Sequence, residues 1–209
     1  FGSLGVLGQT VKTHGGSGTS NLAYGLVAYE FEKIDSSYRS SISVQSSLVI
    51  HPINEFGSQE QKDKYLPQLI KGEKIGCFGL TESEAGSDPA SMKTSFKKTK
   101  DGYILNGSKN WITNAPIADI FIIWAIEENK DHKSIKGFII EKNTEGLNTS
   151  TIENKTSLKI SPTGQIILNN VFVPNNLCLE NTEGWKSVFS CLNKACLLYT
   201  SDAADEDLR

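Results

Sequence analysis

The spacing of the apolar residues changes near Gly76, and this change constrains the possible folds more than any other feature of the chain. Up to that point apolar side chains recur every three or four residues, as in Ala23 to Ile34, which is typical of amphipathic helices. Beyond it, short apolar runs alternate with turn-forming residues, which is typical of antiparallel strands. The sequence therefore predicts an α+β protein, with a helical domain over residues 1–75 and an antiparallel β-sandwich or barrel domain over residues 76–183.

Local signals place the first helices. Ser20 is a suitable cap for the helix that follows it, and Ser58 with Gln61 forms the S-x-x-Q pattern of a capping box. Pro67 predicts that this second helix ends just before it, because proline lacks the amide proton that a helix interior needs. The run Ile42–Ile50 alternates like a strand, but its helical neighbours favour a helix there.

Turn dipeptides and apolar runs locate the strands. Asp101-Gly102 and Asn106-Gly107 are hairpin-type turns on either side of a short apolar run. Further strands are predicted over Ile120–Ile126, Gly137–Glu141 and Gln165–Val173. After Glu183 the pattern again predicts a helix, which the last residues of the chain interrupt.

Charge and apolar content argue against several classes of function. The formal net charge of -3 does not suit a protein that binds phosphate backbones, and the longest apolar run, Ile120–Ile126, is far shorter than the roughly 20 residues of a membrane helix. The three histidines (His14, His51 and His132) and the four cysteines have no metal-ligand or disulfide spacing. We therefore expect no nucleic-acid partner, no membrane insertion and no metal site.

Arginine is rare in this chain: of the 21 basic residues only Arg39 and Arg209 are not lysine. A planar guanidinium binds a carboxylate or phosphate through two hydrogen bonds, which a lysine cannot do. Arg39 is thus a candidate ligand-binding residue. From the residues alone, a structural ion pair with Asp35 or Glu32 is the commoner use of such an arginine.

Two motifs are candidates for cofactor binding. Gly76 to Asp88 predicts a strand that runs into a loop of small residues, which suits an anion such as a pyrophosphate, or else a capped turn before a short helix at Pro89. In Trp111-Ile112-Thr113-Asn114 an aromatic ring and a hydroxyl lie on the same side of a strand. They suit a planar cofactor, although a packed Trp beside a turn is the commoner arrangement.

In this order, the segments of the chain resemble the acyl-CoA dehydrogenase family, over nearly all of residues 1–195. The resemblance rests on short segments: Ala23 to Leu26, Val44 to Leu48, Tyr65 to Leu69, Leu80 to Glu82, Gly86 to Pro89, Trp111 to Asn114 and Cys191 to Asn193. Asp35 to Ser40 resembles the glutaryl-CoA dehydrogenase subgroup. The resemblance implies a helical domain, a middle β domain and a C-terminal helical bundle that begins at residues 184–196. It also implies that Ile42–Ile50 is helical.

The resemblance implies an FAD-dependent oxidoreductase that dehydrogenates an acyl-CoA thioester. For the subgroup this is the oxidative decarboxylation of glutaryl-CoA to crotonyl-CoA, a step of lysine degradation. The alternatives are a dehydrogenase of a short or branched monocarboxylic acyl-CoA, and a truncated module that binds flavin or acyl-CoA without catalysis. The implied partners are an electron-transfer flavoprotein or similar acceptor and further copies of the chain in a homotetramer.

The resemblance also assigns roles to residues. Thr81 bonds the isoalloxazine ring, Trp111 packs against it and Thr113 lies near the hydride-accepting N5. The implied flavin-binding set is Phe78, Gly79, Leu80, Thr81, Gly86, Ser87, Trp111, Ile112 and Thr113. The implied substrate-binding set is Arg39, Ser40, Ser87, Phe189, Leu192 and Asn193. Within the second set, Arg39 and Ser40 hold the far carboxylate of glutaryl-CoA.

The end of the chain departs from the family. Residues 197–209 lack the Ile, Asn and Lys that are frequent elsewhere, and the chain does not begin with Met. We expect residues 197–209 to be a non-native tail on a fragment that lacks the C-terminal bundle and its catalytic glutamate. Glu82 and Glu84 are then loop and capping carboxylates, and the chain alone binds FAD poorly and has no turnover. The expected location is the cytoplasm of a prokaryote or the mitochondrial matrix of a eukaryote.

Overall fold

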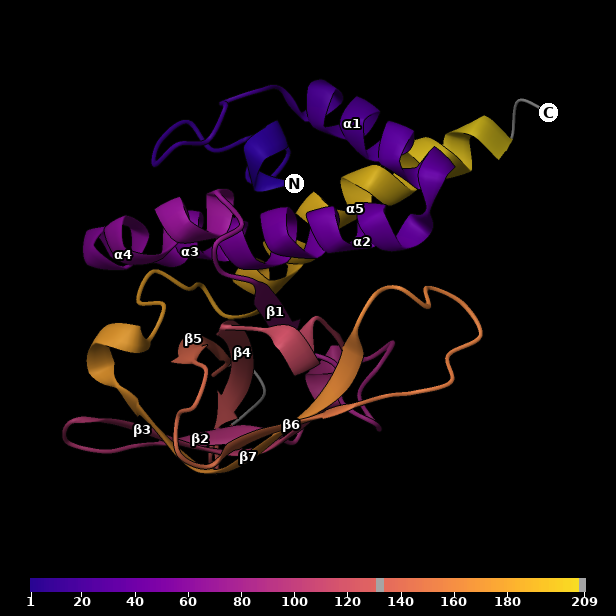
Figure 1. Ribbon diagram of the computed structural model, residues 1–209. Coiled ribbons are helices and arrows are strands. Elements are labelled where there is room, and N and C mark those ends of the chain that lie inside the picture. Colours follow the sequence, from indigo (N-terminus) through magenta and orange to yellow (C-terminus); the bar gives the residue numbers. More distant parts are fainter. Residues whose placement is uncertain (131–133, 207–209) are drawn as a thin grey trace.

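The computed structural model describes residues 1–130 and 134–206, with side chains as far as residue 195. Figure 1 shows helices from both ends of the chain lying over a curled β-sheet. The helices are α1 (Asn21–Ile34), α2 (Ser36–Ser43), α3 (His51–Phe56), α4 (Gln59–Ile70) and α5 (Trp185–Glu206). The strands are β1 (Gly76–Gly79), β2 (Ser95–Lys98), β3 (Gly102–Thr113), β4 (Ile120–Glu127), β5 (Lys136–Glu141), β6 (Leu147–Thr151) and β7 (Thr163–Pro174). The predicted α+β class is confirmed.

Polar side chains begin two helices where the sequence predicts them. At α1, Ser20 Oγ accepts a hydrogen bond from the amide of Ala23 (3.2 Å). At α4, Ser58 Oγ accepts from the amide of Gln61 (3.2 Å), and the Gln61 side chain accepts in return from the amide of Ser58 (3.0 Å). Both predicted caps are therefore confirmed.

The capping box of α4 leads to a first prediction. Ser58→Ala is expected to lower the free energy of unfolding by about 1 kcal/mol, because the amide of Gln61 loses its acceptor. Ser157→Ala, at an exposed serine between β6 and β7, is the control and is expected to change it by less than about 0.5 kcal/mol. Urea denaturation followed by circular dichroism measures both. Equal effects of the two substitutions would contradict the capping role.

Helix α4 does not end before Pro67 as the sequence predicts, but continues to Ile70. The proline removes one hydrogen bond from the helix interior. Leu69 and Ile70 are buried beyond it, and each such side chain contributes roughly 2 kcal/mol when it leaves water. The prediction was wrong because packing of this face outweighs the local effect of the proline.

Residues Ile42–Ile50 are helical, as the family resemblance implies. Helix α2, the π-helical turn η2 (Val44–Ile50) and α3 form one continuous helical run. Most of its side chains are buried between α4, α5 and β1. The alternation that resembles a strand is therefore the consequence of burial on more than one face.

One buried side chain in this run attaches the helical part to the sheet. Gln45 Nε2 donates to the carbonyls of Leu69 (3.0 Å) and Lys74 (2.9 Å), and its Oε1 accepts from the amide of Gly76 (2.9 Å). Gly76 also lies so close to η2 that a Cβ atom would be 2.4 Å from Val49 Cγ1. These contacts set the position of β1, the strand that leads into the loop of small residues.

The seven strands have the order β1-β4-β2-β3-β7-β6, with β5 paired to β4. The pairs β2–β3, β3–β7, β4–β5 and β6–β7 are antiparallel, as the sequence predicts. The pairs β1–β4 and β2–β4 are parallel, which was not predicted. Parallel neighbours need a long connection, and β2, β3 and their loops supply it between β1 and β4.

The dipeptide Asn106-Gly107 does not form the predicted hairpin turn, because β3 continues through it with a shift of register against β7. Gly107 has a φ of +145°, and Asn106 Oδ1 accepts from the amide of Asn170 on β7 (2.8 Å). Residues that favour a tight turn also suit a β-bulge, and only the partner strand distinguishes the two. The turn at Asp101-Gly102 does join β2 to β3.

Strand β4 is buried on both faces, which explains its uninterrupted apolar sequence. Ile120, Ile122 and Trp124 pack into the core shared with the helices. Phe121 and Ile123 pack into a second core inside the curled sheet. The sheet thus lies between the two cores and contributes side chains to both.

Helix α5 packs its buried residues Val188 and Cys191 into the helical core. Its backbone continues to Glu206, so the interruption expected at the final residues is not seen. None of the helices within the described ranges is long and apolar enough to cross a bilayer.

Candidate functional site

Trp111 is the most unusual residue of the sheet. Its backbone is left-handed, with a φ of +59°, and its side chain is 59% exposed. The position coincides with a register irregularity of β3 between Lys109 and Ile112. A bulky residue in this conformation costs about 1–2 kcal/mol, and such strain is concentrated at functional sites. Ile112 points into the core, so Trp111 stands on the outer side of the bulge.

The start of the loop after β1 lies directly against this bulge. The amide of Asn110 donates to the carbonyl of Thr81 (2.9 Å), and Asn110 Nδ2 donates to Ser83 Oγ (3.2 Å). Asn110 Oδ1 also accepts from the amide of Trp111 (3.0 Å). One asparagine therefore holds the loop and the tryptophan side by side.

Three hydroxyls near these segments are available to a ligand. Within the described part of the chain, the side chains of Thr81, Ser87 and Thr113 make no hydrogen bond. Gly86, between Thr81 and Ser87, is exposed, and a Cβ there would meet no atom within 4 Å. An open loop with free hydroxyls suits a polar group such as a phosphate.

The far end of the same loop forms a capped turn before Pro89, which the sequence predicts as the alternative to an anion-binding loop. Asp88 Oδ1 accepts from the amide of Ala90 (3.1 Å) at the start of a short 3-10 helix, η3 (Pro89–Ser91). The capped-turn interpretation is confirmed for this end of the loop, and binding of an anion by the rest of the loop stays a prediction. The remaining members of the predicted flavin-binding set, Phe78, Gly79, Leu80 and Ile112, are buried.

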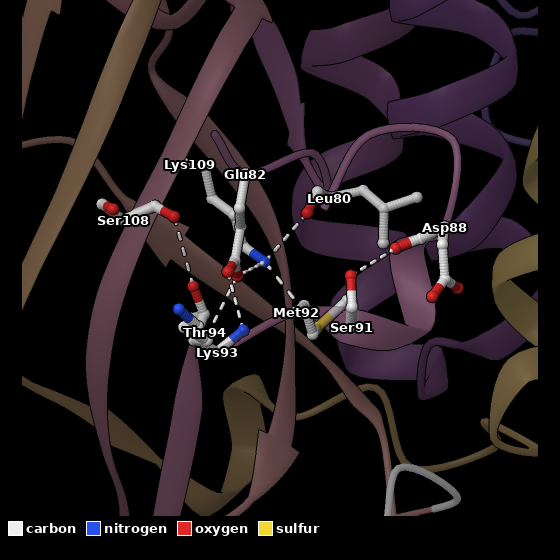
Figure 2. Close-up of polar contacts among 9 residues, drawn as sticks. All are labelled: Leu80, Glu82, Asp88, Ser91, Met92, Lys93, Thr94, Ser108 and Lys109. Atoms are coloured by element: carbon white, nitrogen blue, oxygen red, sulfur yellow. Dashed lines mark hydrogen bonds and ion pairs between the residues drawn. The ribbon is translucent and has the colours of Figure 1, made fainter. Parts of the chain in front are cut away.

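Beneath the loop lies a buried ion pair, shown in Figure 2. Lys109 Nζ donates to Glu82 Oε1 (2.9 Å) and to the carbonyl of Leu80 (3.0 Å). Glu82 also accepts from the amides of Lys93 (2.7 Å) and Thr94 (2.9 Å). Burial lowers the pKa of Lys109 to about 8, although Glu82 acts in the opposite direction. Burial alone would raise the pKa of Glu82, but Lys109 and the two amides outweigh it and lower this pKa.

These contacts settle the nature of the two loop carboxylates. Glu84 is exposed and pairs with the exposed Lys93. Glu82 is not a helix cap, as had been one expectation, because it binds the amides at the start of β2 and the ammonium of Lys109 instead. A carboxylate with these three donors is held in its ionised form.

Arg39 makes the ion pair that the sequence left open. Its Nε donates to Glu32 Oε2 (2.7 Å), while Asp35 instead accepts from the amide of Ser37 (2.6 Å) at the start of α2. Among the described residues, the hydrogen bonds of Arg39 involve Nε alone. The N–H groups of the two terminal guanidinium nitrogens are therefore still available to a ligand.

Five of the six predicted substrate-binding residues lie on helices, and the sixth, Ser87, lies in the loop after β1. Arg39 and Ser40 are on α2, and Phe189, Leu192 and Asn193 are on α5. Phe189 is about half exposed and stacks beside Trp185, with ring centroids 5.9 Å apart. No hydrogen bond or ring contact among the described residues joins these five to Thr81, Trp111 or Thr113. Their role stays a prediction.

No group of three or more potential metal ligands occurs in residues 1–130 and 134–206. His14 instead contacts Asp63 (2.8 Å) and His51 contacts Ser190 (3.3 Å). His132 lies outside the described residues.

Comparison with known families gives a match along most of the chain. Residues 1–73 match the acyl-CoA dehydrogenase N-terminal domain, and residues 77–171 match the acyl-CoA dehydrogenase middle domain. The chain belongs to the acyl-CoA dehydrogenase family. The two matched regions meet between α4 and β1, where Gln45 binds both sides.

Relatives of this family member include enzymes with different names. A short-chain-specific acyl-CoA dehydrogenase of Clostridium acetobutylicum is 39% identical over 176 residues, which are 83% of this chain and 46% of that protein. A glutaryl-CoA dehydrogenase of Mycobacterium smegmatis, solved in complex with FADH2, is 43% identical with a TM-score of 0.90, over 93% of this chain and 50% of that one. Butyryl-CoA dehydrogenase of Megasphaera elsdenii is 35% identical, with a TM-score of 0.86, over 93% and 52%. The chain spans about half the length of these relatives.

The sequence patterns of this acyl-CoA dehydrogenase family member did not identify Lys109, Asn110 or Gln45 as residues that position the site. A signal existed for Lys109, because it takes an inward position in β3, and a charged residue at such a position needs a partner. Glu82 lies 27 residues away, and nothing in the sequence identifies it as that partner.

Proposed function

We propose that this protein takes part in the FAD-dependent α,β-dehydrogenation of an acyl-CoA thioester. The observation that carries the proposal is the exposed, strained Trp111 beside the unpaired hydroxyls of Thr81 and Thr113. The M. smegmatis relative, whose structure contains FADH2, and the relatives named acyl-CoA dehydrogenases support it.

The residues present fit a flavin. The exposed face of the Trp111 indole suits stacking on a flat heteroaromatic ring. Thr81 and Thr113 supply hydroxyls for ring heteroatoms, and Ser87 with the open backbone at Gly86 suits the pyrophosphate. When bound, FAD supplies the hydride acceptor. The buried residues of this segment, Phe78, Gly79, Leu80 and Ile112, would keep water away from a flavin bound there.

The proton acceptor for the reaction is a separate question. Glu82 is paired with Lys109 and Glu84 with Lys93, so neither carboxylate is free to remove the α-proton. We assign no catalytic base to the described residues.

For the substrate we propose glutaryl-CoA, which is oxidised and decarboxylated to crotonyl-CoA. Arg39 keeps donors on both terminal nitrogens, and Glu32 holds its Nε in place, which suits two-point binding of a carboxylate. A short-chain monocarboxylic acyl-CoA is the second candidate, because the C. acetobutylicum and M. elsdenii relatives carry such names. We propose that an electron-transfer flavoprotein accepts the electrons. We also propose that the complete protein is a homotetramer.

Arg39→Lys distinguishes the two substrates. The test uses a chimaera in which residues 1–195 replace the aligned part of the M. smegmatis glutaryl-CoA dehydrogenase. With glutaryl-CoA, kcat/KM is expected to fall at least tenfold, about 1.4 kcal/mol, because a lysine cannot form the two-point contact. With butyryl-CoA it is expected to change less than about twofold, because that substrate has no second carboxylate.

Lys33→Met is the matched control, since Lys33 is an exposed cation on α1 paired with Glu30. It is expected to leave both rates unchanged. Equal losses with the two substrates after Arg39→Lys would contradict the glutaryl-CoA assignment. A folded chimaera that binds no flavin and oxidises neither substrate would contradict the dehydrogenase function itself.

A further inference from the structure

The ion pair between Lys109 and Glu82 is unusual because of its depth. The side chain of Lys109 is 0% exposed and that of Glu82 is 9% exposed. The other lysine–glutamate pairs of the described structure are all largely or partly exposed. Two charges removed from water incur a desolvation cost that their attraction rarely exceeds, so overall stability does not explain this pair.

The contacts of the pair explain it better as a connection between two segments. Lys109, in β3, binds the carbonyl of Leu80 where the loop begins (3.0 Å). Glu82 binds the amides of Lys93 and Thr94 where the loop returns to the sheet. In Figure 2 the ammonium and the carboxylate meet between β3 and the two ends of the loop. Both ends of the loop are thereby held to one strand.

The sequence neighbours of the pair are the residues of the proposed flavin site. Glu82 directly follows Thr81, and Lys109 precedes Trp111 by two residues. Between them, the amide of Asn110 binds the carbonyl of Thr81 (2.9 Å). Each charged group therefore lies only one or two residues along the chain from Thr81 or Trp111.

We propose that Lys109 and Glu82 are positioning residues, which hold Thr81 and Trp111 in the relative arrangement that binds the flavin. The expected effect on flavin binding rests on the proposed function. The expected effect on the arrangement of Thr81 and Trp111 does not, because it follows from the contacts of the ion pair alone. An apolar pair of equal volume would fill the same space, but would not set the direction of the loop, because it has no directional hydrogen bonds.

The test labels the chain with 5-fluorotryptophan and records fluorine NMR spectra. The sequence contains three tryptophans, Trp111, Trp124 and Trp185, so one resonance reports on the site and two report on the cores. Lys109→Met is expected to shift or broaden the Trp111 resonance without ligand, and to leave the other two in place. A titration with FAD to millimolar concentration is expected to give a Kd at least tenfold higher than that of the unmodified chain.

Lys93→Met is the matched control. The side chain of Lys93 is 77% exposed, pairs with a glutamate of the same loop, and takes no part in the buried network, to which only its main-chain amide contributes. It is expected to leave the Trp111 resonance and the Kd unchanged. If Lys109→Met also leaves both unchanged, the positioning role is refuted.

A second variant covers the case in which Lys109→Met unfolds the chain, which all three resonances would reveal. Glu82→Gln with Lys109→Met removes both charges, so neither is left buried alone. A displaced Trp111 resonance in this folded variant supports the proposal, and an unmoved one overturns it. A folded chimaera that binds no flavin refutes the flavin site, while the ligand-free Trp111 resonance of this chain still decides the positioning role.

Discussion

Gln45→Leu is expected to lower the free energy of unfolding by about 3–5 kcal/mol, the largest stability effect that we predict. The side chain of Gln45 is almost fully buried and satisfies the carbonyls of Leu69 and Lys74 and the amide of Gly76. Leucine has a similar volume, but leaves these three backbone groups without a partner. Each buried unsatisfied group costs about 1–3 kcal/mol.

The control for this substitution is Gln68→Leu. Gln68 lies on the outer side of α4, where its side chain donates to the carbonyl of Lys64 (2.8 Å) in an exposed position. Water replaces that bond, so the expected change is below about 0.5 kcal/mol. Urea denaturation measures both variants. If Gln45→Leu costs no more than Gln68→Leu, the amide does not join the two parts of the fold.

Trp111→Gly is expected to affect stability and ligand binding in opposite directions. Glycine adopts a φ of +59° without strain, and the indole is mostly exposed, so the free energy of unfolding is expected to stay equal or to rise by about 1 kcal/mol. Loss of the stacking surface is expected to raise the Kd for FAD at least tenfold. Urea denaturation and a titration followed by flavin fluorescence measure the two effects.

Trp111→Ala separates the two causes. Alanine also lacks the ring, but keeps the strained backbone, so we expect it to be less stable than the glycine variant by about 1 kcal/mol and to bind FAD equally weakly. If neither Trp111→Gly nor Trp111→Ala changes the affinity for FAD, Trp111 is not part of the flavin site. A glycine variant that is strongly destabilised would show that the indole serves the fold instead.

Features that depend on neighbouring residues in the chain were predictable. The caps at Ser20 and Ser58 follow from the reach of a hydroxyl to an amide three residues ahead, whatever lies elsewhere in the molecule. The strand over Ile120–Ile126 follows from its composition and length. The loop after Gly79 and the pair Trp111 and Thr113 were recognised as a candidate site on the same local basis.

Features that depend on a distant partner were predicted wrongly or missed. Pro67 was read as the end of α4, because the buried face beyond it is defined only by the helices and strands around it. Asn106-Gly107 was read as a turn, because only Asn170 on β7 makes it a bulge. For Arg39 the sequence offered two partners, and the fold brings Glu32 into contact with it.

The sequence by itself determined the change from helices to strands near Gly76, the helix caps and the family of the protein, since each is recorded in residues a few positions apart. Only the tertiary structure decided which charges are buried together, which amide joins the helical part to β1, and where β3 bulges to expose Trp111. The reason is physical: the cost of burying Lys109 or Gln45 depends on groups that lie more than 20 residues away along the chain.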